Sequence, residues 1–154
     1  MVQFKHVTGL KDMSREDITD ILDLAESLED VCKGKKKSTE LDKYLMATFF
    51  YEPSTRTRFS FEAAMQRLGG TIISMADAKA TSSAWKGESL ADTIRTIDNY
   101  ADVIVLRHPQ AGAAEEAASY SRVPVLNAGD GTNEHPSQGL LDILTIRRER
   151  GTLD

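Results

Sequence analysis

The chain has 154 residues, enough for one domain with a hydrophobic core and too few for two large domains. Hydrophobic residues make up 40% of the chain and charged residues 28%, a balance that excludes disordered and fibrous proteins. The 24 acidic residues outnumber the 19 basic residues, and the net charge of −5 argues against a general nucleic-acid-binding protein.

The first predicted element is a helix that begins near Ser14. Ser14 stands three residues before Asp17, which is the spacing of a capping box. Apolar residues then recur every three or four positions and are expected to face a core: Ile18, Ile21, Leu22, Ala25, Leu28 and Val31. The basic run at residues 33–37 is predicted to be a solvated turn after this helix.

Strands and helices then alternate along the chain. The predicted strands cover residues 45–51, 71–75, 103–106 and 123–126. The predicted helices cover residues 54–68, 89–100, 113–120 and 137–150. Gly69 and Gly70 are expected to end the first of these helices. This order predicts an α/β fold, a three-layer domain in which helices flank a four-stranded, mainly parallel sheet with right-handed crossovers.

The last predicted helix carries apolar residues close to the end of the chain, namely Leu140, Leu141, Ile143, Leu144 and Ile146. Only residues 151–154 follow this helix. An apolar helix face normally packs against a partner, so we expect the natural protein to continue beyond Asp154. We assign residues 1–136 to one domain and residues 137–154 to the start of a helix that leads out of it.

The cysteine content and the apolar runs indicate a cellular location. Cys32 is the single cysteine, so the chain can form no intrachain disulfide and no cysteine-rich metal site, which fits a reducing compartment. The longest apolar run, residues 45–51, is far shorter than the ~20 residues that span a bilayer. The first residues do not resemble a signal peptide. We expect a cytoplasmic protein that does not enter a membrane.

Polar loops follow the four predicted strands, at residues 52–58, 81–88, 107–110 and 133–138. Ligands of open parallel sheets bind beyond the carboxyl ends of the strands. The four loops are therefore expected to meet at one edge of the sheet and to form a binding site there.

The first of these loops has the composition of a phosphate site. Ser54 and Thr55 open a helix, where unpaired backbone N–H groups and the helix dipole favour an anion. The hydroxyl of Thr57 and the guanidinium of Arg56 would complete the site, because arginine suits paired oxygen contacts. Alternatively, Ser54 or Thr55 is an ordinary N-cap, and both arginines of the loop, Arg56 and Arg58, are exposed. The loop alone does not decide between these interpretations.

Arg107 and His135 are the further candidates for this site. Arg107 ends an aliphatic strand, so it either faces the loop edge as an ordinary strand-end arginine or meets an anion. His135 and Gln138 stand three apart at a helix start and can face one ligand, although a loop histidine bonded to backbone is the alternative. We interpret His6 and His108 as structural. The histidines lack the spacing of metal ligands, so no metal site is predicted.

Several common catalytic motifs are missing from the chain. It contains neither a P-loop nor a dinucleotide-binding glycine motif, which disfavours nucleotide kinases and dinucleotide oxidoreductases. It also lacks a serine nucleophile elbow. Lys86 lies in a long loop rich in serine and alanine, which is either a solvated insertion or an element that reaches a neighbouring subunit.

Five segments together carry a family resemblance: Phe50–Glu62, Lys86–Thr93, Arg107–Gln110, Leu126–Gly131 and His135–Gln138. With these segments in this order, the chain closely resembles the amino-terminal, carbamoyl-phosphate-binding domain of the aspartate transcarbamoylase family. The Ser54–Arg58 element also occurs in ornithine transcarbamoylases, whereas three other segments are similar to the aspartate enzymes, namely Lys86–Glu88, Arg107–Gln110 and Asn127–Gly131. Members of the family are about twice as long as this chain, so the aspartate-binding domain is absent from it.

The resemblance implies a reaction and its partners. The family transfers the carbamoyl group from carbamoyl phosphate to the amine of L-aspartate and releases phosphate, a step of pyrimidine biosynthesis that needs no cofactor. Residues 1–136 would then be the carbamoyl-phosphate-binding domain and residues 137–154 the start of the interdomain helix, a half-enzyme that we expect to be inactive alone. The alternatives are an ornithine transcarbamoylase and a non-catalytic phosphate-binding or oligomerisation module.

The resemblance also implies roles for individual residues. The phosphate would be bound by Ser54, Thr55, Arg56, Thr57 and Arg107. The carbonyl oxygen would be contacted by Thr57, Arg107 and His135, and the carbamoyl nitrogen by Gln138. Ser82 and Lys86 match residues that enter the active site of the adjacent subunit in a homotrimer, and Glu52 matches a position that ties the two domains together. Regulatory chains are possible partners, whereas nucleic acid and membrane are not expected.

Overall fold

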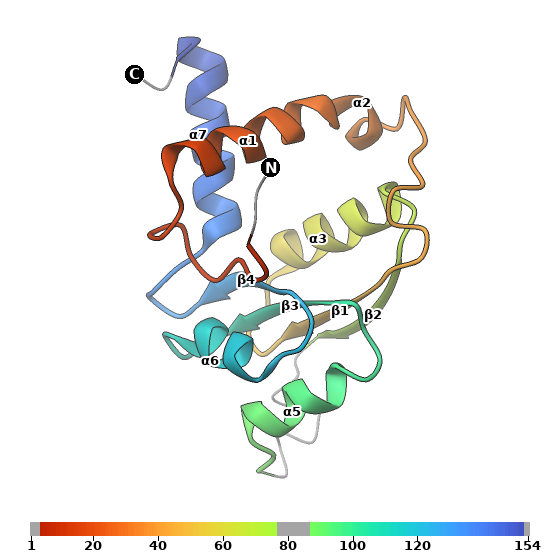
Figure 1. Cartoon of the computed structure of the whole chain (residues 1–154), viewed down its shortest axis with the longest axis vertical. Helices are drawn as coiled ribbons and strands as arrows, with labels where there is room; N and C mark the ends of the chain where they lie inside the picture. Colours follow the sequence, from red (N-terminus) through yellow and green to blue (C-terminus); the bar gives the residue numbers. More distant parts are fainter. Residues whose placement is uncertain (1–3, 77–86, 153–154) are drawn as a thin grey trace.

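The computed structural model describes residues 4–76 and 87–152 of the chain (Figure 1). Its centre is one four-stranded sheet, in which the strands lie in the order β2-β1-β3-β4. The strands are β1 (Leu45–Phe50), β2 (Thr71–Ala76), β3 (Val103–His108) and β4 (Val125–Asp130). Each neighbouring pair of strands is parallel, which confirms the predicted α/β fold and makes the sheet wholly parallel.

Helices cover both faces of the sheet (Figure 1). One face carries α5 (Leu90–Ile97) and α6 (Ala113–Tyr120). The other face carries α3 (Thr55–Arg67) and, further out, α1 (Arg15–Ser27), α2 (Glu29–Cys32) and α7 (Pro136–Arg150). In the described part of the chain, no helix is long and apolar enough to cross a membrane.

Alternate residues of each strand fill two separate cores. In β1, Ala47 belongs to the cluster with α5 and α6, whereas Met46 and Phe50 belong to the cluster with α3. In β3, Ile104 and Val105 divide in the same way. This alternation follows from the two-residue repeat of a strand. It also decides which face each polar residue at the strand ends reaches.

The amino-terminal helix differs from its prediction. The capping box is confirmed, since the Ser14 hydroxyl accepts a hydrogen bond from the Asp17 amide at 3.1 Å. The predicted single helix is nevertheless broken at Leu28, whose φ and ψ of −90° and 3° separate α1 from the short α2. Of the predicted apolar face, only Leu22 and Val31 are buried. The break redirects α2 toward α3, where Arg67 donates a hydrogen bond to the Val31 carbonyl at 3.5 Å.

The last two strands extend beyond the apolar runs that predicted them. β3 continues to His108, and β4 begins at Val125 and continues to Asp130, with His108 opposite Asp130 in the ladder. Polar residues at the carboxyl ends keep the strand pairing, so the periodicity of apolar residues alone placed these ends too early. Arg107 is therefore part of β3, near its carboxyl end, and not part of a loop.

The last helix is only partly covered. Leu141 and Ile146 are 57% and 49% exposed. Arg147 joins α7 to α1 through ion pairs with Asp23 at 2.8 Å and Glu26 at 2.5 Å. Charged contacts therefore hold this helix to α1, while part of its apolar surface has no cover within the described residues.

Candidate functional site

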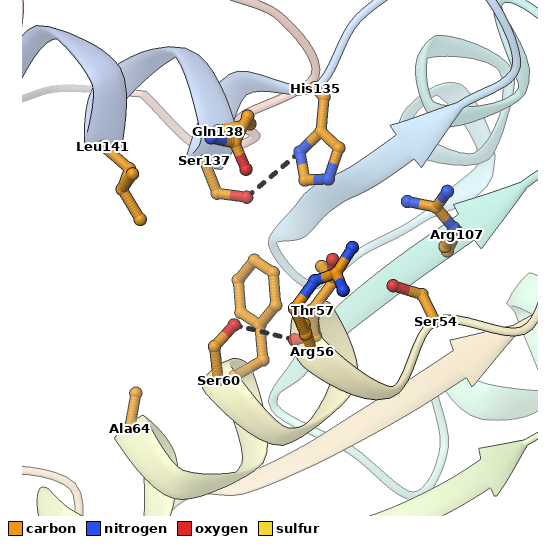
Figure 2. A pocket seen from close by; sticks show the side chains of 11 residues that line it. Ser54, Arg56, Thr57, Ser60, Ala64, Arg107, His135, Ser137, Gln138 and Leu141 are labelled. Atoms are coloured by element: carbon orange, nitrogen blue, oxygen red, sulfur yellow. Dashed lines mark hydrogen bonds between the residues drawn. The ribbon is translucent and has the colours of Figure 1, made fainter.

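A hollow of about 650 Å³ lies beyond the carboxyl end of β3, between the first turns of α3 and α7 (Figure 2). Its walls come from segments far apart in the sequence: Ser54, Arg56, Thr57, Ser60, Phe61, Ala64, Arg107, His135, Ser137, Gln138 and Leu141. The polar loops after β1, β3 and β4 therefore meet at this edge of the sheet, as the topology predicts.

The alternation of β3 directs Arg107 into this hollow. Val105 faces the α3 side of the sheet, and Arg107, two residues later, has the same orientation. His108 lies on the opposite side, where its ring meets Tyr51 edge-on with a centroid distance of 4.7 Å. Its Nδ1 accepts the Gln110 amide at 3.1 Å. These contacts agree with the structural interpretation of His108.

Arg107 is held in place by the end of β4. Its Nη1 donates to the Ala128 carbonyl at 2.9 Å, and its Nε lies 3.7 Å from a carboxylate oxygen of Glu52. That Nε is buried and has no hydrogen-bond partner among the described residues. A buried N–H of this kind is costly to leave unpaired, so the arrangement favours an additional acceptor at this position.

Gly129 makes the close approach of Arg107 and His135 possible. Its φ of +114° is a conformation that side-chain-bearing residues rarely adopt. A Cβ atom placed there would lie 2.6 Å from Nη1 of Arg107 and 3.3 Å from Cδ2 of His135. The glycine thus lets two ligand candidates from different strand ends pack over one backbone position.

The start of α3 presents hydroxyl groups and a second guanidinium to the hollow. Ser54 is the N-cap residue, yet within the described residues its side chain makes no capping hydrogen bond. The ordinary N-cap interpretation is therefore wrong for this side chain. Figure 2 shows Ser54 and Arg56 on the same side of the hollow as Arg107. The first turn of α3 adds the positive end of the helix dipole.

Thr55 does not line this hollow. It lies with Arg58 along a separate, smaller hollow of about 180 Å³. Successive helical residues are rotated by about 100°, so the side chains of Thr55 and Arg56 point in different directions. Arg58 instead lies 3.6 Å from Glu62 within α3. The predicted contribution of Thr55 to phosphate binding can come only from its backbone N–H in this geometry.

His135 caps the start of α7 next to Pro136, the first residue of the helix. Its Nδ1 lies 3.3 Å from the Ser137 hydroxyl, and its other ring nitrogen faces the hollow (Figure 2). Burial, and then the positive charge of Arg107, lower the pKa of His135 below 6.5. The imidazole is therefore neutral at pH 7 and acts as a hydrogen-bonding group without adding charge.

Gln138 lines the hollow but is turned along α7. Its Nε2 donates to Asp142 at 2.9 Å, so this amide N–H already has a partner. The amide nitrogen carries a second N–H and the amide oxygen is a separate acceptor, so Gln138 can contact a ligand while it keeps this bond. Ser82 and Lys86 lie outside the described residues, so their predicted part in a neighbouring site stays a prediction.

Sequence reasoning missed part of the lining: Ser60, Phe61, Ala64, Ser137 and Leu141. Helical periodicity could have found most of them, because Ser60, Phe61 and Ala64 stand three, four and seven positions after Thr57, and Leu141 stands three after Gln138. Among the described residues, no group of three or more histidine, cysteine, aspartate or glutamate side chains could hold a metal ion. Two guanidinium groups, hydroxyls and a helix start instead form a site that can hold a small oxyanion.

The chain is similar in sequence to known proteins. Residues 5–148 match the family described as aspartate/ornithine carbamoyltransferase, carbamoyl-P binding domain. The chain is 56% identical, over 150 residues, to the aspartate carbamoyltransferase catalytic subunit of Methanocaldococcus jannaschii. It is 52% identical, over 152 residues, to the chloroplastic aspartate carbamoyltransferase 1 of Pisum sativum. These matches cover 97% and 99% of this chain but 49% and 39% of the relatives.

Solved structures show the same likeness. The catalytic subunit of the M. jannaschii aspartate transcarbamoylase superimposes with a TM-score of 0.91 at 55% identity, over 98% of this chain and 49% of that one. The Trypanosoma cruzi aspartate transcarbamoylase, in complex with carbamoyl phosphate and aspartate, gives a TM-score of 0.91 at 44% identity. That match covers 99% of this chain and 48% of the other. The chain thus spans about half the length of these relatives.

Proposed function

Since the chain belongs to the aspartate/ornithine carbamoyltransferase family, we propose that it is the carbamoyl-phosphate-binding half of an aspartate carbamoyltransferase catalytic subunit. One observation carries the proposal: Arg56, Arg107 and His135, which come from three different strand ends, line one hollow. Two cationic groups beside a helix start suit a phosphate ester, and the neutral imidazole suits a carbonyl oxygen.

The proposed reaction is acyl transfer to an amine. The amine nitrogen of L-aspartate forms a bond to the carbamoyl carbon, the bond from that carbon to the phosphate oxygen breaks, and the amine loses a proton. Negative charge grows first on the carbonyl oxygen and then on the departing phosphate. Fixed donors placed where this charge develops lower the barrier without a covalent intermediate.

The residues of the hollow divide between these two charges. The phosphate would be bound by the side chains of Ser54, Arg56, Thr57 and Arg107 and by the backbone N–H of Thr55. Thr57, Arg107 and His135 would contact the carbonyl oxygen, with the neutral ring of His135 donating from its free nitrogen. The amide oxygen of Gln138 would accept a hydrogen bond from the carbamoyl nitrogen. The catalytic set is therefore Arg56, Thr57, Arg107 and His135.

The proposal includes partners beyond the described residues. Residues 1–136 would form the carbamoyl-phosphate-binding domain, and residues 137–154 would begin the helix that leads to the aspartate-binding domain. L-Aspartate would be held by that second domain. Ser82 and Lys86 would serve the adjacent subunit of a homotrimer in the cytoplasm, to which regulatory chains can attach.

Calorimetry with carbamoyl phosphate tests this function. We expect the 154-residue chain to bind one equivalent, in competition with inorganic phosphate, and to form no N-carbamoyl-L-aspartate by itself. Joined to the aspartate-binding half of a relative, it should carbamoylate L-aspartate. An absence of carbamoyl phosphate binding would contradict the proposal.

Two alternatives give different results in the same assays. An ornithine transcarbamoylase would carbamoylate L-ornithine and not L-aspartate in the joined protein. A phosphate-binding module without catalysis would bind carbamoyl phosphate and still form no product after joining. Either outcome would replace the aspartate assignment.

A further inference from the structure

A buried carboxylate stands behind the proposed site without lining it. Asp130, the last residue of β4, is 1% exposed and is not among the residues that face the hollow. A buried ionised carboxylate is unfavourable unless hydrogen bonds compensate its lost hydration. The hydrogen bonds of Asp130 therefore identify the segments that this buried carboxylate holds together.

Four donors surround the Asp130 carboxylate. Its Oδ1 accepts from the Glu134 amide at 2.9 Å and from Nδ2 of Asn127 at 3.0 Å. Its Oδ2 accepts from the Gly112 amide at 2.9 Å and from Nδ2 of Asn133 at 3.1 Å. These donors use most of the accepting capacity of a carboxylate. Burial raises the pKa of Asp130, but the hydrogen bonds outweigh burial and lower it, so the group is ionised at neutral pH.

Three of the four donors belong to the segments that follow β3 and β4, and the fourth, Asn127, lies within β4. Glu134 directly precedes His135, and its carbonyl also accepts from the Asp130 amide at 3.2 Å. Gly112 is the N-cap of α6, at the end of the loop that follows Arg107 and His108. The Gly131 amide donates to the His108 carbonyl at 2.9 Å. Asp130 and its neighbour thus tie the β3–α6 loop to the β4–α7 turn.

The backbone beside Asp130 carries this constraint to the hollow. Gly129 precedes it and supports both Arg107 and His135, while the Ala128 carbonyl accepts from Arg107. A rotation of the β4 end would therefore move the supports of both side chains together.

We propose that Asp130 is a positioning residue of the carbamoyl phosphate site, which clamps the β3–α6 loop to the β4–α7 turn so that Arg107 and His135 meet at one ligand. The inference rests on the proposed function. Asp130 acts through these two residues and does not touch the ligand itself. A misplacement of about 1 Å in such groups can cost about 100-fold in activity, so the clamp has a functional effect separate from its stability.

Asp98 provides a matched control at the opposite edge of the sheet. Its side chain is 1% exposed, and it accepts from the Ser121 hydroxyl at 2.9 Å and from the Arg122 amide at 2.7 Å. It follows α5 and precedes β3, so it lies at the amino ends of the strands and away from the hollow. Asp98→Asn therefore perturbs a buried carboxylate of similar chemistry without touching the site.

The experiment compares Asp130→Asn and Asp98→Asn in the 154-residue chain. The readouts are the urea midpoint, the dissociation constant of carbamoyl phosphate, and the ring resonances of the three histidines, assigned with His→Gln variants. We expect both substitutions to lower the urea midpoint. Only Asp130→Asn should shift the His135 resonance and raise the dissociation constant, by about 10- to 100-fold. Asn133→Ala removes one exposed donor and should change the His135 resonance and the dissociation constant in the same direction, but less. This variant takes the place of Asp130→Asn if the Asp130→Asn chain does not fold.

Two results would overturn the inference. One is an Asp130→Asn chain whose His135 resonance and dissociation constant stay at the wild-type values. The other is an Asp98→Asn chain in which both change as much as in Asp130→Asn. If the wild-type chain does not bind carbamoyl phosphate, the proposed function fails, and the His135 resonance still tests the clamp by itself.

Discussion

The two faces of the sheet differ in how completely they are closed. On the α5/α6 face, the core residues Ile94, Ile104 and Val125 are 0% exposed and belong to one cluster of buried side chains. On the α3 face, Met46, Phe50 and Met65 form a smaller core, and the hollow opens beside it between α3 and α7. One face therefore maintains the fold, while the other leaves room for a ligand.

The same strands contribute side chains to both faces of the sheet, so adjacent residues of one strand have different roles. Arg107 and His108 are adjacent in β3, yet one faces the hollow and the other packs on Tyr51. The period of two residues in a strand is the cause. Substitutions at neighbouring positions can thus separate stability from ligand binding.

The largest difference is expected between the closed core and the exposed apolar surface of α7. Ile104→Ala should lower the free energy of unfolding by about 2–5 kcal/mol, because it leaves a cavity in a tightly packed cluster. Ile146→Ala, at a residue that is 49% exposed, should change it by no more than about 0.5 kcal/mol. Urea denaturation of both variants measures this difference. Equal losses would mean that Ile146 is buried in solution.

The next comparison uses the adjacent pair in β3. Arg107→Gln should weaken carbamoyl phosphate binding by about 10- to 100-fold, the equivalent of one charge-assisted hydrogen bond. His108→Gln should leave the dissociation constant unchanged, since His108 faces α5 and α6. Calorimetry on both variants gives the result. A loss of affinity in His108→Gln as large as that in Arg107→Gln would show that the two faces are not independent.

A smaller effect is expected in the pH dependence of the free energy of unfolding, to which histidines on both faces of the sheet contribute. Burial lowers the pKa of His6, His108 and His135 below 6.5, so the unfolded chain binds protons more readily than the folded chain. The stability that these neutral rings contribute is complete above pH 6.5 and is lost as the pH falls through their folded pKa values. The melting temperature should therefore fall between about pH 7.5 and about pH 5.5. Replacing all three histidines by glutamine should flatten this dependence, and an unchanged slope would assign it to other groups.

Sequence patterns predicted the sheet and the convergence of three of its polar loops, whereas the predicted loop at residues 81–88 lies mostly outside the described residues. Apolar periodicity placed the helices and strands, and the rule for open parallel sheets brought Arg56, Arg107 and His135 to one edge. The break at Leu28 depends on the contact of α2 with α3, which local periodicity does not contain. The hydrogen bonds of Asp130 could not be predicted from the sequence either, because their donors come from segments that are separate along the chain.

The central claim is that the hollow on the α3 face binds carbamoyl phosphate. Amide chemical shifts of the 154-residue chain, followed during titration with carbamoyl phosphate, test it most directly. We predict saturable shifts at the start of α3, around Arg107 and over residues 128–138, with little change in α5 or in the amino-terminal half of β1. Shifts confined to other surfaces, or no saturable shift, would contradict the claim.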